Sequence, residues 1–177
     1  MKHGVSPSQH AANIIGALSL GLADRIVTET EALIGAGANA SAAIILIGSR
    51  PDLTIDDLRH GVRLTHSATV RTVMRLKNAG LVEKRAGEDG RSVYLRLSAK
   101  GRRDMARVIR LREKILDDAF ATLSRAELEQ FGAMAARVLP NIVPQSVSVD
   151  AICRLCDGSV CPDAMCPLTP ERDARAQ

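Results

Sequence analysis

Two short helices followed directly by a β-hairpin constrain the fold of this chain more than any other feature. Thr54 precedes the first helix as a capping residue, and Thr65 precedes the second, which ends before Gly80. Residues 81–85 and 92–97 alternate between apolar and polar positions on either side of a glycine-rich turn, so we expect them to pair as a hairpin. This order predicts a helix-turn-helix unit with a two-stranded wing.

Four further helices are expected around this unit. Apolar residues recur at helical spacing over 7–33, 98–122 and 124–139, and the run 40–47 is almost wholly apolar, which predicts burial on all sides. The predicted fold class is mainly α, a winged helix-turn-helix with a helical region outside it and a small four-cysteine tail. The expected domains are N-terminal helices over 7–50, the winged helix-turn-helix over 51–101, C-terminal helices over 102–140, and a linker with a cysteine-rich tail over 141–177. Residues 140–152, which begin at the end of the last helix, are expected to form the linker.

Basic residues are concentrated in one third of the chain. Residues 59–112 contain 15 Lys and Arg against 4 Asp and Glu, whereas the remainder contains 9 against 16. A strongly basic segment on an acidic scaffold is typical of a unit that binds nucleic acid. Single-strand binders stack bases on aromatic side chains. Only 2% of the residues here are aromatic, so double-stranded DNA is the expected partner.

The second helix of the unit carries the candidate DNA contacts. In a helix-turn-helix this helix enters the major groove, where its N-terminal side chains face base edges. Arginine binds guanine through two hydrogen bonds, hydroxyl groups pair with several bases, and aliphatic side chains contact the thymine methyl group. The predicted base contacts are His66, Ser67, Thr69, Val70 and Arg71, the predicted phosphate contacts are Arg75 and Lys77, and Arg85 and Arg91 of the hairpin are expected to reach the minor groove.

The stretch from Leu64 to Gly101 resembles the MarR family of bacterial transcription regulators. The similarity lies in Arg75-Leu76 followed by Gly80-Leu81-Val82, in the wing-tip Asp89-Gly90-Arg91, and in Leu97-Ser98-x-Lys100-Gly101. The helix order over 7–140 is similar to that family too. Two positions depart from its usual pattern, because Thr69 stands where an aliphatic residue is common and Val70 stands where Thr or Ser is common.

This resemblance implies an obligate homodimer, in which the N-terminal helix and the last two helices form the dimerisation region. It also implies that Arg91 contacts DNA, that Asp89 braces the wing, and that Arg71 occupies a frequent contact position. Proteins of this kind bind pseudo-palindromic operators. They are commonly repressors that are relieved by a small-molecule effector or by oxidation.

All four cysteines of the chain lie close together near its C-terminus. Cys153, Cys156, Cys161 and Cys166 have the spacing C-x2-C-x4-C-x4-C, which suits chelation of one ion by thiolates. Zinc in a closed tetrahedral site is the first expectation. The alternatives are an iron–sulfur cluster, which the Cys166-Pro167 ending favours, and a metal-free thiol switch. The site would either stabilise the fold of a tail with few apolar residues or sense metal and redox state.

An enzyme and a metal-dependent interaction module are the competing functions for the four-cysteine site. Four thiolates would close the coordination position that a catalytic zinc keeps open, and the sequence has no phosphate loop or nucleophile motif. The tail lacks aromatic residues, which disfavours a zinc-binding module that recognises single-stranded nucleic acid. We recognise no secretory signal, and the apolar stretch 11–23 is expected to be too short for a membrane span, so a cytoplasmic location is expected.

Overall fold

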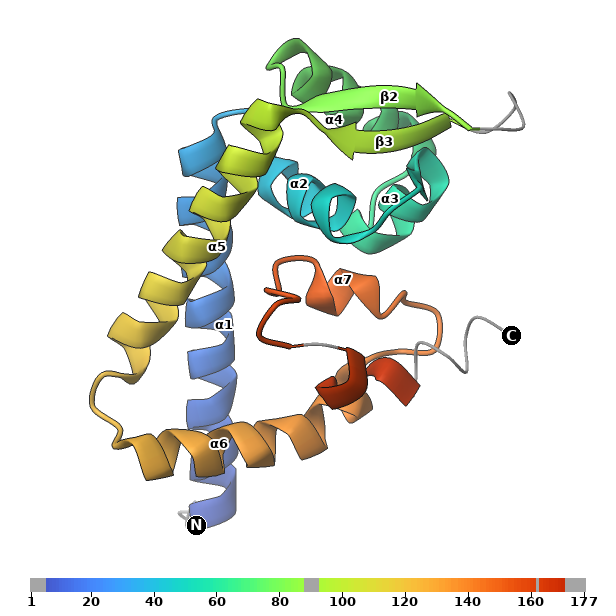
Figure 1. The fold of residues 1–177 in the computed structure, drawn as a ribbon. Coiled ribbons are helices and arrows are strands. Elements are labelled where there is room, and N and C mark those ends of the chain that lie inside the picture. The colour runs from blue at the N-terminus through green and yellow to red at the C-terminus, as the bar shows by residue number, and fades with distance from the viewer. Residues whose placement is uncertain (1–5, 88–92, 162, 171–177) are drawn as a thin grey trace, which may run out of the picture.

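The computed structural model describes residues 6–87, 93–161 and 163–170. Its helices are α1 (Pro7–Ile34), α2 (Ala40–Ser49), α3 (Ile55–Val62), α4 (His66–Asn78), α5 (Ala99–Phe120), α6 (Arg125–Val138) and α7 (Asp150–Cys153), with short 3-10 helices η1 (Leu139–Ile142) and η2 (Asp163–Met165), and its strands are β1 (Leu53–Thr54), β2 (Val82–Ala86) and β3 (Val93–Leu97). The predicted helices and hairpin are confirmed. Figure 1 shows the hairpin and α2 to α4 at one end of the molecule, with α1 and α5 extending away from them.

Capping residues explain where several helices begin and end. The side chains of Thr54, Ser98 and Ser124 each accept a hydrogen bond from a backbone N–H in the first turn of the helix that follows. α1 ends at Gly35, whose backbone φ of 65° lies in the left-handed region that glycine adopts without strain. These boundaries depend on a few local residues, which is why they are visible in the sequence.

α2 lies at the centre of the hydrophobic core. Every residue from Ala40 to Ile47 is buried, and side chains of α3, α4, α5 and the sheet pack around this helix. The hydroxyl of Thr30 in α1 is buried and donates to Oγ of Ser41 at 3.1 Å. The core therefore fixes the helix-turn-helix unit to the base of the long helices α1 and α5, which pack against each other.

The two-stranded wing expected from the sequence is confirmed as β2 and β3, and β1 adds a third strand to their sheet. The strand order is β1-β3-β2, and both pairings are antiparallel. β1 contains only Leu53 and Thr54, which pair with Leu95 and Tyr94 of β3. Two residues are too few to show the alternation by which a strand is recognised, so the sequence pattern does not reveal β1.

Residues 140–152 do not form the linker that the sequence predicts. Val143, Val149 and Ala151 are at most 6% exposed, and α7 packs against α3. Leu168, beyond the last cysteine, joins Val143 and Val149 in a small second core. The tail therefore folds back against the helix-turn-helix unit. Its buried residues have no regular spacing, so no helical or strand periodicity in the sequence identifies them.

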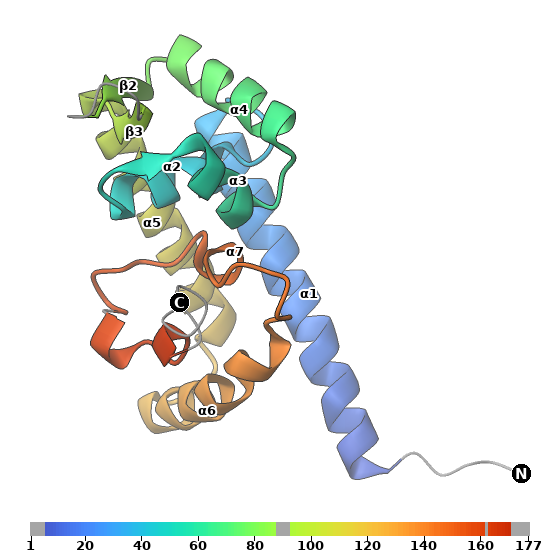
Figure 2. The same cartoon turned by 90° about the vertical axis from the view of Figure 1, so that its right-hand side faces the viewer.

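α1 and α6 leave much apolar surface uncovered. The exposed apolar side chains are Ile14, Ile15 and Leu20 on α1 and Leu128, Met134 and Val138 on α6, with exposed fractions from 42% to 68%. α6 has no buried residue, and most of it lies away from α1 in Figure 2. α1 is long and apolar enough to cross a membrane by length and composition alone, so the expectation based on the shorter stretch 11–23 is wrong on length.

Candidate nucleic-acid interface

α4 presents most of the predicted DNA contacts on an open surface. Thr65 caps this helix, because its hydroxyl accepts a hydrogen bond from the backbone N–H of Ala68 at 3.3 Å. Figure 2 shows α4 at the outer edge of the molecule. Among the predicted contacts on α4, Val70 is half-buried and the exposed ones are His66, Ser67, Arg71, Arg75 and Lys77. The exposed side chains are accessible to a partner.

Thr69 is wrong as a predicted base contact. Its side chain is fully buried, and its hydroxyl donates to the backbone carbonyl of Thr65 at 3.0 Å. It lies on the inner face of α4 together with Thr72, Val73 and Leu76, which are buried in the core. A threonine whose hydroxyl bonds to its own helix backbone can be buried much as valine is. The sequence analysis therefore took Thr69 for a surface residue because of its polar side chain.

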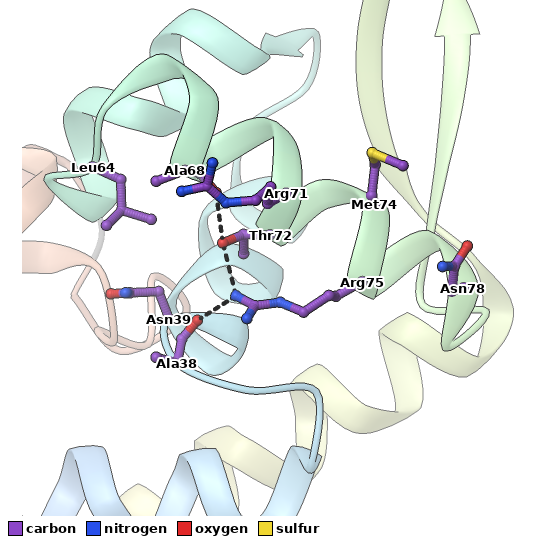
Figure 3. A pocket seen from close by; sticks show the side chains of 9 residues that line it. All are labelled: Ala38, Asn39, Leu64, Ala68, Arg71, Thr72, Met74, Arg75 and Asn78. Atoms are coloured by element: carbon purple, nitrogen blue, oxygen red, sulfur yellow. Dashed lines mark hydrogen bonds between the residues drawn. The ribbon is translucent and has the colours of Figure 1, made fainter.

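Arg75 points from α4 towards the loop between α1 and α2. Its guanidinium Nη2 donates to the carbonyl of Ala38 at 3.3 Å and to Oγ1 of Thr72 at 3.1 Å, as the dashed lines in Figure 3 show. Gly37 lies against the same guanidinium, where a Cβ would come within 3.1 Å of Nη1. Arg75 therefore holds α4 against the scaffold in this structure, and its contact with phosphate stays a prediction.

A groove separates α4 from the same loop. Its volume is about 480 Å³, and Figure 3 shows its lining side chains. Arg71 and Arg75 supply positive charge, and Leu64 and Met74 supply apolar surface. Such a combination of apolar walls with a few charged groups suits a small organic anion.

The wing carries one predicted DNA contact within the described residues. Arg85 lies on β2 with its side chain exposed. The predicted contact Arg91 and the predicted brace Asp89 lie outside the described residues. Arg96 of β3 is also exposed, but it forms an ion pair with Asp52 at 3.1 Å. Of the two described arginines of the wing, Arg96 is held by this ion pair. Arg85 is exposed and forms no ion pair with another described residue.

The motif that follows the wing anchors it to the end of α4. Oγ of Ser98 donates to the carbonyl of Gly80 at 2.6 Å. Nζ of Lys100 donates to the carbonyl of Ala79 at 2.7 Å. These two bonds satisfy carbonyl groups at the C-terminal end of α4 and link them to the first turn of α5. The position of the wing relative to α4 is thereby fixed.

Two further residues belong to this surface, although the sequence analysis did not single them out. Met74 follows Val70 by one helical turn and is 55% exposed, so the four-residue spacing is the signal that identifies it. Arg63 lies in the turn between α3 and α4 with φ 55°, in the left-handed region, and its side chain is exposed. No periodicity marks such a turn residue in the sequence.

The four cysteines line one cavity between the tail and the end of α2. This cavity has a volume of about 490 Å³, and Arg50 and Asp150 also line it. All four cysteines are thiols in this structure. Burial raises the pKa of the Cys161 thiol, and the neighbouring thiols of Cys166 and Cys156 raise it further. The fold thus gathers the four residues that the sequence nominates as ligands.

The four thiols share one cavity, but their present positions among the described residues do not form a coordination site. Among residues 6–87, 93–161 and 163–170, no group of three or more His, Cys, Asp or Glu side chains is placed to hold a metal as it stands. Tight turns bring the cysteines near one another, since the backbone N–H of Cys156 donates to the carbonyl of Cys153 at 2.8 Å. Ion binding would require the thiols to converge within their shared cavity.

Comparison of sequences identifies the helix-turn-helix unit. Residues 41–101 match a family model described as a winged helix DNA-binding domain. The match takes in α2, which the predicted boundary at 51 leaves out, and the burial of α2 in the same core agrees with this. A Bacillus subtilis protein described as the uncharacterized HTH-type transcriptional regulator YwhA is 33% identical over 86 residues. The matched segment covers 48% of this chain and 62% of that protein.

Solved structures share the fold over part of this chain. Streptococcus pneumoniae FabT in complex with DNA has a TM-score of 0.62 at 20% identity, over 75% of this chain and 96% of that one. A MarR family protein from Bacillus stearothermophilus has a TM-score of 0.64 at 21% identity, over 78% and 99%. Escherichia coli MarR without ligand has a TM-score of 0.61 at 19% identity, over 77% and 100%. This chain therefore contains a winged helix domain within the fold of the MarR-type regulators.

Proposed function

We propose that this protein is a transcription regulator that binds double-stranded DNA as a homodimer in the cytoplasm. The outward face of α4 carries the proposal, because it combines His66, Ser67 and Arg71 at the N-terminal end of a helix in a winged helix domain. The basic segment 59–112 adds charge suited to phosphates. A structure of the same fold, FabT, is a DNA complex.

Dimer formation would cover the apolar faces of α1 and α6. Exposed apolar surface of this kind usually marks an interface. α1 also contains Asp24, Arg25 and Glu29, and Arg25 pairs with Glu29 at 2.7 Å, which favours a second protomer over lipid as the cover. Two winged helix domains related by a two-fold axis would bind a pseudo-palindromic operator.

Selection from a pool of random duplexes tests this function. We expect the full chain to enrich pseudo-palindromic sites whose half-sites lie about 10 base pairs apart or at a multiple of that spacing. Sedimentation of the protein with the enriched duplex should give two chains per site. If no duplex is enriched even at low salt, the DNA-binding function is wrong. Enrichment of isolated half-sites by a single chain would refute the dimer.

We further propose that the bound dimer represses transcription and that a small-molecule effector in the groove of Figure 3 relieves it. The two arginines that line the groove support an organic anion as the effector. Placing the enriched site over a reporter promoter tests the sign of regulation. Lower reporter output on expression of the protein is expected, and higher output would show activation instead.

We also propose that Cys153, Cys156, Cys161 and Cys166 bind one zinc ion, with an iron–sulfur cluster as the alternative. The shared cavity of the four thiols supports a common site. Elemental analysis and an optical spectrum of protein purified without oxygen test it. About one zinc per chain and no visible absorption are expected. Iron with sulfide and a brown colour would replace zinc by a cluster, and a metal-free protein would exclude both.

A further inference from the structure

The cysteine tail is joined to the winged helix domain by a partly buried ion pair. Arg50 follows the last residue of α2, and Asp150 is the first residue of α7. The Arg50 guanidinium donates to Oδ1 of Asp150. The side chain of Asp150 is 13% exposed and that of Arg50 is 33% exposed. Removing one charge would leave its partner poorly solvated, so this pair resists separation.

α7 rests directly on α3. A Cβ at Gly61 of α3 would lie 3.4 Å from Cβ of Asp150, so the two helices approach closely at this point. Ala151 of α7 is fully buried, and Leu155 packs against the main core. α3 packs in turn against α4, the helix that presents the candidate base contacts. A single helix therefore separates the tail from the DNA-binding surface.

The cysteines and this ion pair share one cavity. Arg50 and Asp150 line it together with the four thiols, and Cys153 ends the short helix that Asp150 begins. The small core of the tail contains Val143, Val149 and Leu168 as its buried side chains. A core of this size contributes little stability, and small folded units commonly gain more from a bound metal. An ion bound by four thiolates would tie residues 153–166 into one unit and supply that stability.

We propose that zinc bound by the four cysteines keeps α7 docked on α3 through the Arg50–Asp150 ion pair, and that this docking raises the affinity for operator DNA. The inference rests on the proposed DNA-binding function. Coupling between two sites usually amounts to about 5- to 150-fold, and we expect zinc-free protein to bind duplex about tenfold more weakly. By thermodynamic reciprocity, the duplex tightens zinc binding by the same factor.

The substitution Asp150→Asn separates docking from metal binding. It keeps all four cysteines, so the protein should still contain about one zinc per chain. Zinc-loaded Asp150→Asn should bind the selected duplex as weakly as the zinc-free wild type, and chelation should weaken it no further. Asp104→Asn is the matched control, because Asp104 is 14% exposed and pairs with Arg107 within α5 at 2.8 Å. That variant should keep the full response to zinc.

Two measurements on the dimer of this chain test the proposal. Affinity for the selected duplex is measured with zinc, after chelation and after zinc is restored, and hydrogen exchange of α3 and α7 is followed in parallel without DNA. We expect chelation to weaken binding reversibly and to accelerate exchange in both helices. Unchanged affinity and exchange in the wild type, or a full zinc response in Asp150→Asn, would overturn the proposal. Zinc-dependent exchange without binding to any duplex would support docking and refute the DNA-binding function.

Discussion

At Gly101, the junction between the wing and α5 leaves no space for a side-chain carbon atom. A Cβ at this position would lie 2.1 Å from the backbone oxygen of Leu81 and 3.3 Å from Cβ of Leu97. The Leu81 oxygen already accepts a hydrogen bond from the backbone N–H of Ser98 at 3.0 Å. It cannot move aside without weakening that bond, so glycine is required here by close approach rather than by its backbone angles.

Gly101→Ala is therefore expected to lower the free energy of unfolding by about 1–3 kcal/mol, the usual cost of overpacking. Thermal unfolding of the dimer measures the change, and about 2–4 °C is expected for each kcal/mol in a chain of this length. Gly158→Ala is the control, since a Cβ at Gly158 meets open space outside the proposed interface helices and should change the free energy of unfolding by no more than about 0.5 kcal/mol. Equal effects of the two substitutions would contradict the packing argument.

Arg71 and Thr69 are expected to differ sharply although both lie near the start of α4. Arg71→Ala should relax the preference at particular base pairs, at a cost of about 1–3 kcal/mol in binding, because Arg71 is exposed. Thr69→Val should leave both the base preference and the free energy of unfolding nearly unchanged. The Thr65 carbonyl loses the hydroxyl of residue 69 but still accepts a hydrogen bond from its backbone N–H at 2.9 Å. Selection with each variant measures this. A changed base preference in Thr69→Val would restore Thr69 as a contact.

The helices and the hairpin could be predicted from the sequence because their ends depend on local residues. Thr54, Thr65 and Ser124 cap helices by bonds to the next turn, and apolar spacing sets the helices that follow. The docking of the tail could not be predicted, because it depends on an ion pair between Arg50 and Asp150 and on contacts without periodicity. On α4 the exposed positions of His66, Arg71 and Lys77 were predicted, whereas the burial of Thr69 was not, because its polar side chain does not mark a core position.

α6 is expected to be an interface helix, and Met134 tests this. Met134 is 56% exposed on α6, and Met74 is 55% exposed on α4, so the same substitution can be compared at both places. Met134→Glu should shift the protein from dimer to monomer, because it places a charge in an apolar interface. Met74→Glu should leave the dimer intact and weaken duplex binding by repelling phosphate. Sedimentation measures the first effect and fluorescence anisotropy the second.

Three outcomes would each contradict a different part of this assignment. A Met134→Glu variant that stays dimeric would show that α6 does not lie in the interface. A wild-type protein that partitions into vesicles would show that lipid, and not a second protomer, covers the apolar face of α1. Loss of dimer in Met74→Glu would mean that α4 itself takes part in association.

The charge of the whole molecule is divided between a basic end and an acidic remainder. Residues 59–112 run from within α3 through α4 and the wing into α5, so much of the basic segment lies at the winged helix end of Figure 1, and its last part continues along α5. A molecule with this division approaches DNA with its basic end forward, because the acidic remainder is repelled by phosphate. Orientation and affinity thus come partly from the fold as a whole.

Duplex binding is therefore expected to fall steeply with salt, with the logarithm of the binding constant decreasing by about 0.9 per phosphate contact for each unit in the logarithm of salt concentration. Lys77→Ala should reduce this slope by about 0.9 without changing the base preference, because Lys77 is exposed near the end of α4. Lys114→Ala is the control, since Lys114 lies far along α5 and pairs with Asp118 at 2.7 Å. Titrations at several salt concentrations measure both slopes. If Lys114→Ala lowered the slope as much as Lys77→Ala, DNA would have to contact α5 as well, and the placement of the duplex against α4 and the wing would be wrong.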